Sequence, residues 1–84
     1  MPAPTHRIHI RFFAVLREQA GCPALDVETG AATPAALYAE LQSRHPLVFP
    51  GSLLRVSINE SYATMESPLK AGDRVVFIPP VAGG

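Results

Sequence analysis

The residues with the clearest potential for chemistry are the last two, Gly83 and Gly84. Neither has a side chain, so a backbone that ends in them fits a narrow channel and can approach another protein's catalytic groups closely. The final carboxylate is then an unhindered acyl group. ATP can activate it as an acyl adenylate, and sulfur can replace one of its oxygens to give a thiocarboxylate. Two glycines alone also occur at frayed ends and cloning scars. The residues before them must therefore show whether the glycines belong to a functional tail.

Those preceding residues favour a projecting tail. Pro79 and Pro80 cannot donate hydrogen bonds to a sheet, so strand pairing is expected to end there. Two consecutive prolines also favour a stiff, extended chain. Extended at 3.3–3.6 Å per residue, the segment 79–84 spans about 20 Å. We therefore predict an extended Gly-Gly tail over residues 79–84.

The elements that must position this tail are short. Residues 74–78 are apolar on both faces, which is typical of a strand in the middle of a sheet. A short helical turn is expected over 14–20, ended by Gly21. Alternation of apolar and polar residues, or a short apolar run between turn residues, predicts further strands over 7–13, 25–28, 53–59 and 62–64.

One longer helix has a defined start and end. Thr33 offers a hydroxyl that can cap a free backbone N–H, and Pro34 at the first helical position loses no needed donor. Pro46 ends the helix because it disfavours the α conformation in the residue before it. We predict a helix over 34–44. Its expected core-facing stripe comprises Ala36, Leu37 and Leu41.

These elements predict an α+β fold with a mixed sheet of about five strands packed on one main helix. The first and last strands should lie side by side in the middle. We assign residues 1–6 to a flexible lead-in, 7–78 to a single domain and 79–84 to the tail.

One helix covers only one face of such a sheet, which bears on partner binding. If Phe77 points inward, Val76 and Ile78 point to the uncovered face, beside the tail. Exposed apolar side chains in that position indicate a docking patch. Coverage by the chain's own loops is the alternative, and a register shift of one residue would exchange the two faces.

Composition argues against several classes of function. The 84-residue chain has zero formal net charge and scattered Lys and Arg, unlike the basic clusters that bind nucleic acid. No apolar run approaches the roughly 18 residues that span a bilayer. Residues 1–5 lack the blocks of a secretory signal, and the single cysteine, Cys22, cannot form an internal disulfide. We expect a cytoplasmic protein with no nucleic-acid or membrane partner.

Other reactive side chains form no recognisable site. His6, His9 and His45 lack metal-ligand spacing, and the carboxylates are dispersed without a pair placed for acid–base work. Cys22 lies in a Gly-Cys-Pro segment with little to activate a thiol, where a lone cysteine is more often incidental. We therefore expect no metal, no bound cofactor and no catalysis by this chain alone.

Two segments resemble the family of small subunits of molybdopterin synthase. Residues 10–18, Ile-Arg-Phe-Phe-Ala-Val-Leu-Arg-Glu, followed by Gly21, are similar to the opening of that family. Residues 71–84 are similar to its close, with a strand followed by Pro-Pro-Val, a small residue and Gly-Gly. The resemblance covers nearly the whole chain. It departs in the leading residues 1–5 and at Arg74, where an acidic residue is common.

The resemblance implies the ubiquitin-like β-grasp fold and a sulfur carrier. It implies that an E1-like adenylating enzyme activates the terminal carboxylate with ATP, and that a sulfur-transfer system forms the thiocarboxylate. The tail then enters the large subunit, where sulfur passes to cyclic pyranopterin monophosphate. Gly84 would carry the sulfur, and Gly83 would be its slender neighbour. The partner-binding residues would be Phe13, Val76, Ile78, Pro79, Pro80, Val81 and Ala82.

Three alternatives stay open. A sulfur carrier for thiamine or cysteine synthesis would share the tail and the fold, although the opening Arg-Phe-Phe-Ala pattern favours molybdopterin synthase. A ubiquitin-like protein modifier would be joined to lysines through an isopeptide bond. A bare interaction module would keep its function without Gly83 and Gly84.

Overall fold

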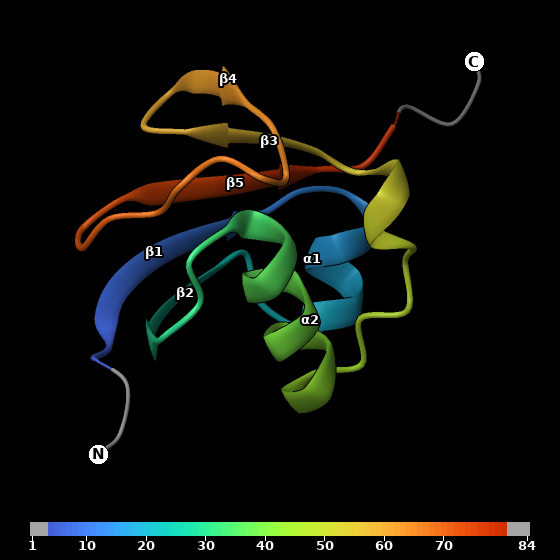
Figure 1. The fold of residues 1–84 in the computed structure, drawn as a ribbon. Helices are drawn as coiled ribbons and strands as arrows, with labels where there is room; N and C mark the ends of the chain where they lie inside the picture. Colours follow the sequence, from blue (N-terminus) through green and yellow to red (C-terminus); the bar gives the residue numbers. More distant parts are fainter. Residues whose placement is uncertain (1–3, 81–84) are drawn as a thin grey trace.

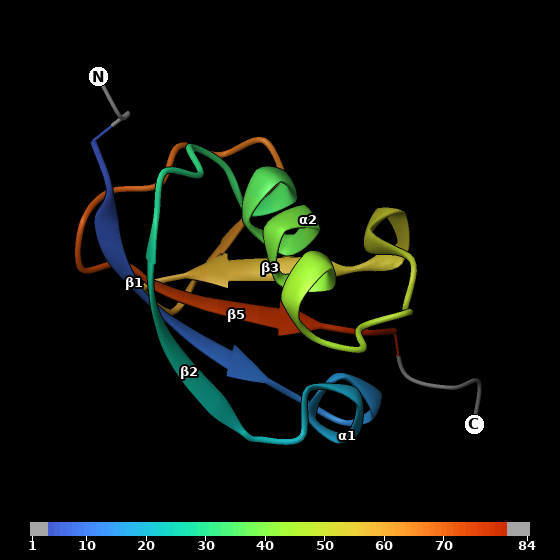
Figure 2. The same ribbon diagram turned by 90° about the horizontal axis from the view of Figure 1, so that it is seen from below.

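The computed structural model describes residues 4–80, which form a mixed five-stranded sheet with helices packed against one face (Figure 1). The strands are β1 (His6–Phe12), β2 (Ala24–Thr29), β3 (Arg55–Ile58), β4 (Ser61–Ala63) and β5 (Arg74–Ile78). The helices are α1 (Val15–Ala20), α2 (Pro34–Arg44) and the short 3-10 helix η1 (Gly51–Leu53). Figure 2 shows α2 crossing the middle of the sheet and α1 beside the end of β1.

The strand order is β2-β1-β5-β3-β4. β5 lies parallel to β1 and antiparallel to β3, so the first and last strands are neighbours in the middle of the sheet. This arrangement, a mixed sheet packed on one main helix, confirms the predicted ubiquitin-like β-grasp fold.

The central strands bury alternate residues, as the sequence pattern predicts. Ile8, Ile10 and Phe12 of β1 are buried, and Val75 and Phe77 of β5 have no exposed surface. Phe12 and Phe77 lie opposite each other in the parallel pair. The inward orientation of Phe77 is therefore confirmed, and the register leaves Val76 and Ile78 on the opposite face, where both are partly exposed.

Helix α2 begins and ends where the sequence predicts. The hydroxyl of Thr33 accepts a hydrogen bond from the Ala36 backbone N–H at 3.2 Å. The predicted core stripe is wrong at Ala36, which is exposed. The buried residues are spaced i, i+3, i+4 and i+7, which places them on one face and Ala36 away from it. They are Pro34, Leu37, Tyr38 and Leu41.

Several boundaries differ from the predicted ones by one or two residues, as in β3, which is predicted over 53–59 and spans Arg55–Ile58. β1 begins at His6, which we had placed in the lead-in. His6 pairs with Thr29, and its ring Nε2 lies 3.0 Å from the carbonyl oxygen of Ala31. The 3-10 helix η1 was not predicted, because three residues are too few to give a hydrophobic period.

Candidate functional site

The candidate site begins where β5 ends. Pro79 is buried and Pro80 is exposed, so Pro80 is the first exposed residue after β5. Pro79 continues the inward-facing alternation of Val75 and Phe77, which explains its burial although we expected the tail to leave the body there. The predicted tail residues Val81, Ala82, Gly83 and Gly84 lie outside the described residues.

Exposed apolar side chains lie at the same end of the sheet. Phe13 follows Phe12, the partner of Phe77, and 47% of its surface is exposed. Leu53 lies two residues before Arg55, which is opposite Ile78, and 56% of its surface is exposed. Figure 1 shows η1, which contains Leu53, at the end of the sheet from which β5 leads onward. Phe13 and Leu53 therefore flank the point where the tail begins.

The loop between α2 and η1 is held by hydrogen bonds with side chains of α1 and α2. The Gln19 side-chain oxygen accepts hydrogen bonds from the backbone N–H groups of Val48 at 3.0 Å and Phe49 at 3.3 Å. The Tyr38 hydroxyl donates to the carbonyl oxygen of Phe49 at 2.8 Å, and burial raises the pKa of Tyr38. These bonds fix the loop that leads to Leu53. Leu53 was not among the predicted site residues, because no local pattern shows which residues between α2 and β3 lie near the tail.

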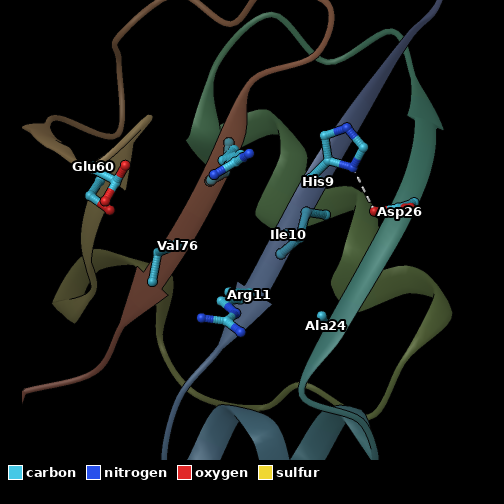
Figure 3. A pocket seen from close by; sticks show the side chains of 10 residues that line it. His9, Ile10, Arg11, Ala24, Asp26, Glu60 and Val76 are labelled. Carbon is cyan, nitrogen blue, oxygen red and sulfur yellow. Dashed lines mark hydrogen bonds and ion pairs between the residues drawn. The ribbon is translucent and has the colours of Figure 1, made fainter.

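The uncovered face of the sheet is polar over β1 and β2. His9 Nδ1 lies 2.7 Å from Asp26 Oδ1, and Arg7 Nε lies 3.3 Å from Glu28 Oε1, both across the β1–β2 pair. These exposed pairs contribute little to stability, about 0–1 kcal/mol each. Figure 3 shows His9 pointing toward Asp26 on the neighbouring strand.

The same face carries an open groove of about 420 Å³ beside β5. Figure 3 shows Arg11 and Val76 on adjacent strands within it, with Glu60 at its far side. Arg11 lies directly opposite Val76, and Ser57 lies opposite Val76 on the other side. The predicted docking residue Val76 therefore lies among basic and polar side chains rather than in a continuous apolar patch.

The other side chains considered in the sequence are the potential metal ligands and Cys22. Within residues 4–80, no three side chains of the His, Cys, Asp and Glu types lie close enough together to hold a metal ion. Cys22 is partly buried, and its thiol lies 3.9 Å from the Ala20 carbonyl oxygen. None of the helices in the described part of the chain has the length and apolar character needed to cross a bilayer.

Comparison with known proteins places these features in context. Residues 10–84 match the ThiS family. The chain is 35% identical over 80 residues to the molybdopterin synthase sulfur carrier subunit of Haemophilus influenzae. That alignment covers 92% of this chain and 99% of the relative.

Two solved structures share the fold. Small archaeal modifier protein 1 of Haloferax volcanii is 28% identical with a TM-score of 0.76, and the match covers 90% of this chain and 99% of that one. In the complex of subunits 1 and 2 of molybdopterin-converting factor from Helicobacter pylori, the matched chain is 26% identical with a TM-score of 0.64. That match covers 93% of this chain and 99% of the other.

Proposed function

The chain belongs to the ThiS family, and from that membership we propose that it is the sulfur-carrier small subunit of a molybdopterin synthase. The observation that carries the proposal is its 35% identity, over 92% of its length, to a relative of that name. The position of β5 supports it, because the central strand of the sheet leads directly to Pro80 and the Gly-Gly sequence.

The proposed chemistry takes place at the carboxylate of Gly84. Its oxygen attacks the α-phosphate of ATP, which forms an acyl adenylate and releases pyrophosphate. A sulfide-level donor then displaces AMP and leaves a thiocarboxylate. That sulfur attacks cyclic pyranopterin monophosphate and joins Gly84 to it through a thioester. Water then cleaves the acyl–sulfur bond, which leaves the sulfur on the pterin and returns the carboxylate of Gly84. This chain would act as a co-substrate of these steps, and Gly83 would let the terminus enter a narrow channel.

Two protein partners follow from this proposal. An E1-like adenylating enzyme would activate Gly84, and the large synthase subunit would receive the sulfur. The Helicobacter pylori complex of subunits 1 and 2 supports a large-subunit partner. Phe13, Val76, Ile78 and Pro80 offer a docking surface because each is at least partly exposed at or near the end of β5. We place the whole reaction in the cytoplasm, in keeping with the free thiol of Cys22.

A protein modifier is the second candidate function. The similarity to small archaeal modifier protein 1 favours it. A modifier would form an isopeptide bond between Gly84 and a lysine of another protein. Covalent conjugates that shift in mass on a denaturing gel, and that disappear when Gly84 is deleted, would identify this function.

The first test is the intact mass of the chain after incubation with its E1-like enzyme, ATP and a sulfur source. Replacing a carboxylate oxygen with sulfur adds about 16 Da. Oxidation of Met or Cys adds nearly the same mass, so the shift must map to the C-terminal peptide. A parallel incubation without ATP is the control. An unchanged C-terminal peptide, with an enzyme shown to be active on another carrier, would contradict the proposal.

A further inference from the structure

We propose that Arg11, Arg55 and Arg74 form an arginine bracket that docks an acidic surface with an apolar centre on the large synthase subunit. The bracket is defined by these three residues around Val76 and Ile78. The identity of the partner rests on the proposed function, whereas the bracket itself is read from strand register, exposure and charge.

The strand register sets the geometry of the bracket. Arg74, Val76 and Ile78 are alternate residues of β5, so they line one face of that strand at intervals of about 7 Å. Arg11 on β1 lies opposite Val76, and Arg55 on β3 lies opposite Ile78. Neighbouring strands are about 4.8 Å apart. The apolar pair therefore has an arginine on three sides.

The fourth side of the bracket faces the tail. Ile78 is the last residue of β5 and is followed by buried Pro79 and exposed Pro80. A protein that receives residues beyond Pro80 must lie against this end of the sheet, next to Ile78 and Arg55. The bracket is thus continuous with the route by which the proposed carrier would enter its partner.

Charge pairing distinguishes the bracket from the rest of the face. Arg7 and His9 pair with Glu28 and Asp26, respectively. Arg11, Arg55 and Arg74 are exposed, and none has a carboxylate of another described residue within 4.0 Å. Glu60 lines the groove with Arg11 and Arg74 but forms no such pair. Carboxylates of another protein would therefore complement the charge of these three arginines on the sheet face.

The mixture of charge and apolar surface favours a protein over a nucleic acid. Val76 and Ile78 are partly exposed between the arginines, as in an interface with an apolar centre and a polar rim. Arginine also offers a planar fork that binds carboxylates through two hydrogen bonds. An acidic protein surface satisfies all of these features.

The test is the affinity of the full chain for the purified large subunit of the same organism, measured by calorimetry at low and high ionic strength. Each of R11Q, R55Q and R74Q should weaken binding about two- to fivefold at low salt. The triple variant R11E/R55E/R74E should weaken it at least about tenfold and lose most of the salt dependence. R44Q is the matched control, because Arg44 is an exposed arginine at the end of α2, outside the bracket. Thermal unfolding confirms that each variant is folded.

The outcomes separate the bracket from the proposed function. If the wild-type chain binds the large subunit and the bracket variants bind equally well, the bracket is wrong and the function stands. If the wild-type chain does not bind the large subunit, both are wrong. Affinity lost only toward the E1-like enzyme, or tight bracket-dependent binding of a labelled single-stranded RNA, would overturn the assigned partner.

Discussion

The aromatic rings of Tyr38 on α2 and Phe77 on β5 are in contact, with centroids 5.2 Å apart and planes inclined by 57°. This tilted arrangement is one that aromatic pairs favour. It joins the main helix to the strand that leads to the tail. The Tyr38 hydroxyl also donates a hydrogen bond to Phe49 in the loop before η1. One helical residue therefore contacts both the strand that leads to the tail and the loop that leads to Leu53.

Truncation of Phe77 should be strongly destabilising. Phe77→Ala removes a fully buried ring from the centre of the core. We expect the free energy of unfolding to fall by about 3–5 kcal/mol, through lost burial and the remaining cavity. Urea denaturation followed by circular dichroism measures the change. Val76→Ala on the uncovered face is the control and should cost less than about 1 kcal/mol; equal losses would show that the two faces are misassigned.

Tyr38 should make the protein less stable at alkaline pH. Burial raises the pKa of Tyr38 in the folded state, so the folded protein disfavours the phenolate. The resulting stabilisation is complete below the unfolded value of about 10 and is lost as pH rises through the higher folded value. Tyr38→Phe should cost about 1 kcal/mol near neutral pH, through the lost hydrogen bond to Phe49. It should also flatten the alkaline decline.

Tyr62→Phe is the control for this experiment, because Tyr62 is 89% exposed and is the only other tyrosine. Thermal unfolding across the alkaline range compares the two variants with the wild type. An alkaline decline that is unchanged in Tyr38→Phe would assign the effect to another group.

Removal of the two terminal glycines should separate folding from transfer. Deleting Gly83 and Gly84 leaves β5 and the described core intact, so the urea midpoint should stay within the error of the wild type. Under the proposed function, formation of molybdopterin in a reconstituted assay should fall to background. A truncated chain that still supports molybdopterin formation would exclude the tail mechanism.

The side chain of Gln19 should govern the mobility of the loop at Val48 and Phe49. Gln19→Ala removes the oxygen that accepts both backbone N–H groups. Hydrogen exchange at these two amides should accelerate, and the free energy of unfolding should fall by about 1–2 kcal/mol. Gln19→Glu keeps an acceptor oxygen and is the matched control. Equal exchange rates in both variants would mean that another contact holds the loop.

The turn between β3 and β4 offers a stabilising substitution. Asn59 and Glu60 both have positive φ, 51° and 69° respectively. Asn tolerates this conformation, whereas for Glu it is strained, and glycine is favoured at the second position of such hairpin turns. Glu60→Gly should raise the free energy of unfolding by about 0.5–1 kcal/mol. Glu60→Ala keeps a β-carbon and should not reproduce the gain.

Local patterns were sufficient to predict most of the fold. The bounds of β5 and α2 agree with the structure, because one is a short apolar run beside turn residues and the other has a Thr-Pro start and a proline stop. The central position of β5 also agrees with the pattern of residues 74–78, because a strand that is apolar on both faces is typical of the middle of a sheet.

Features that depend on distant contacts could not be predicted in this way. The burial of Tyr38 depends on its placement against Phe77, 39 residues later in the chain. Gln19 is a polar residue of a short helix, and its role requires a loop 29 residues away. For the candidate site, sequence reasoning identified Val76 and Ile78 as a pair. It did not bring Arg11 and Arg55 beside them, because that placement depends on strand register.

The position of β5 between β1 and β3 has a mechanical consequence. A partner that draws the terminus into a channel pulls β5 along its own axis. The strand is hydrogen-bonded to β1 on one side and to β3 on the other. A force along the strand is therefore shared by all of these hydrogen bonds in shear, and they must break together. Sideways peeling would break them one at a time. The sheet therefore resists unfolding most strongly when the force acts along the axis of β5, which is the direction in which a partner would pull the C-terminus of the proposed carrier.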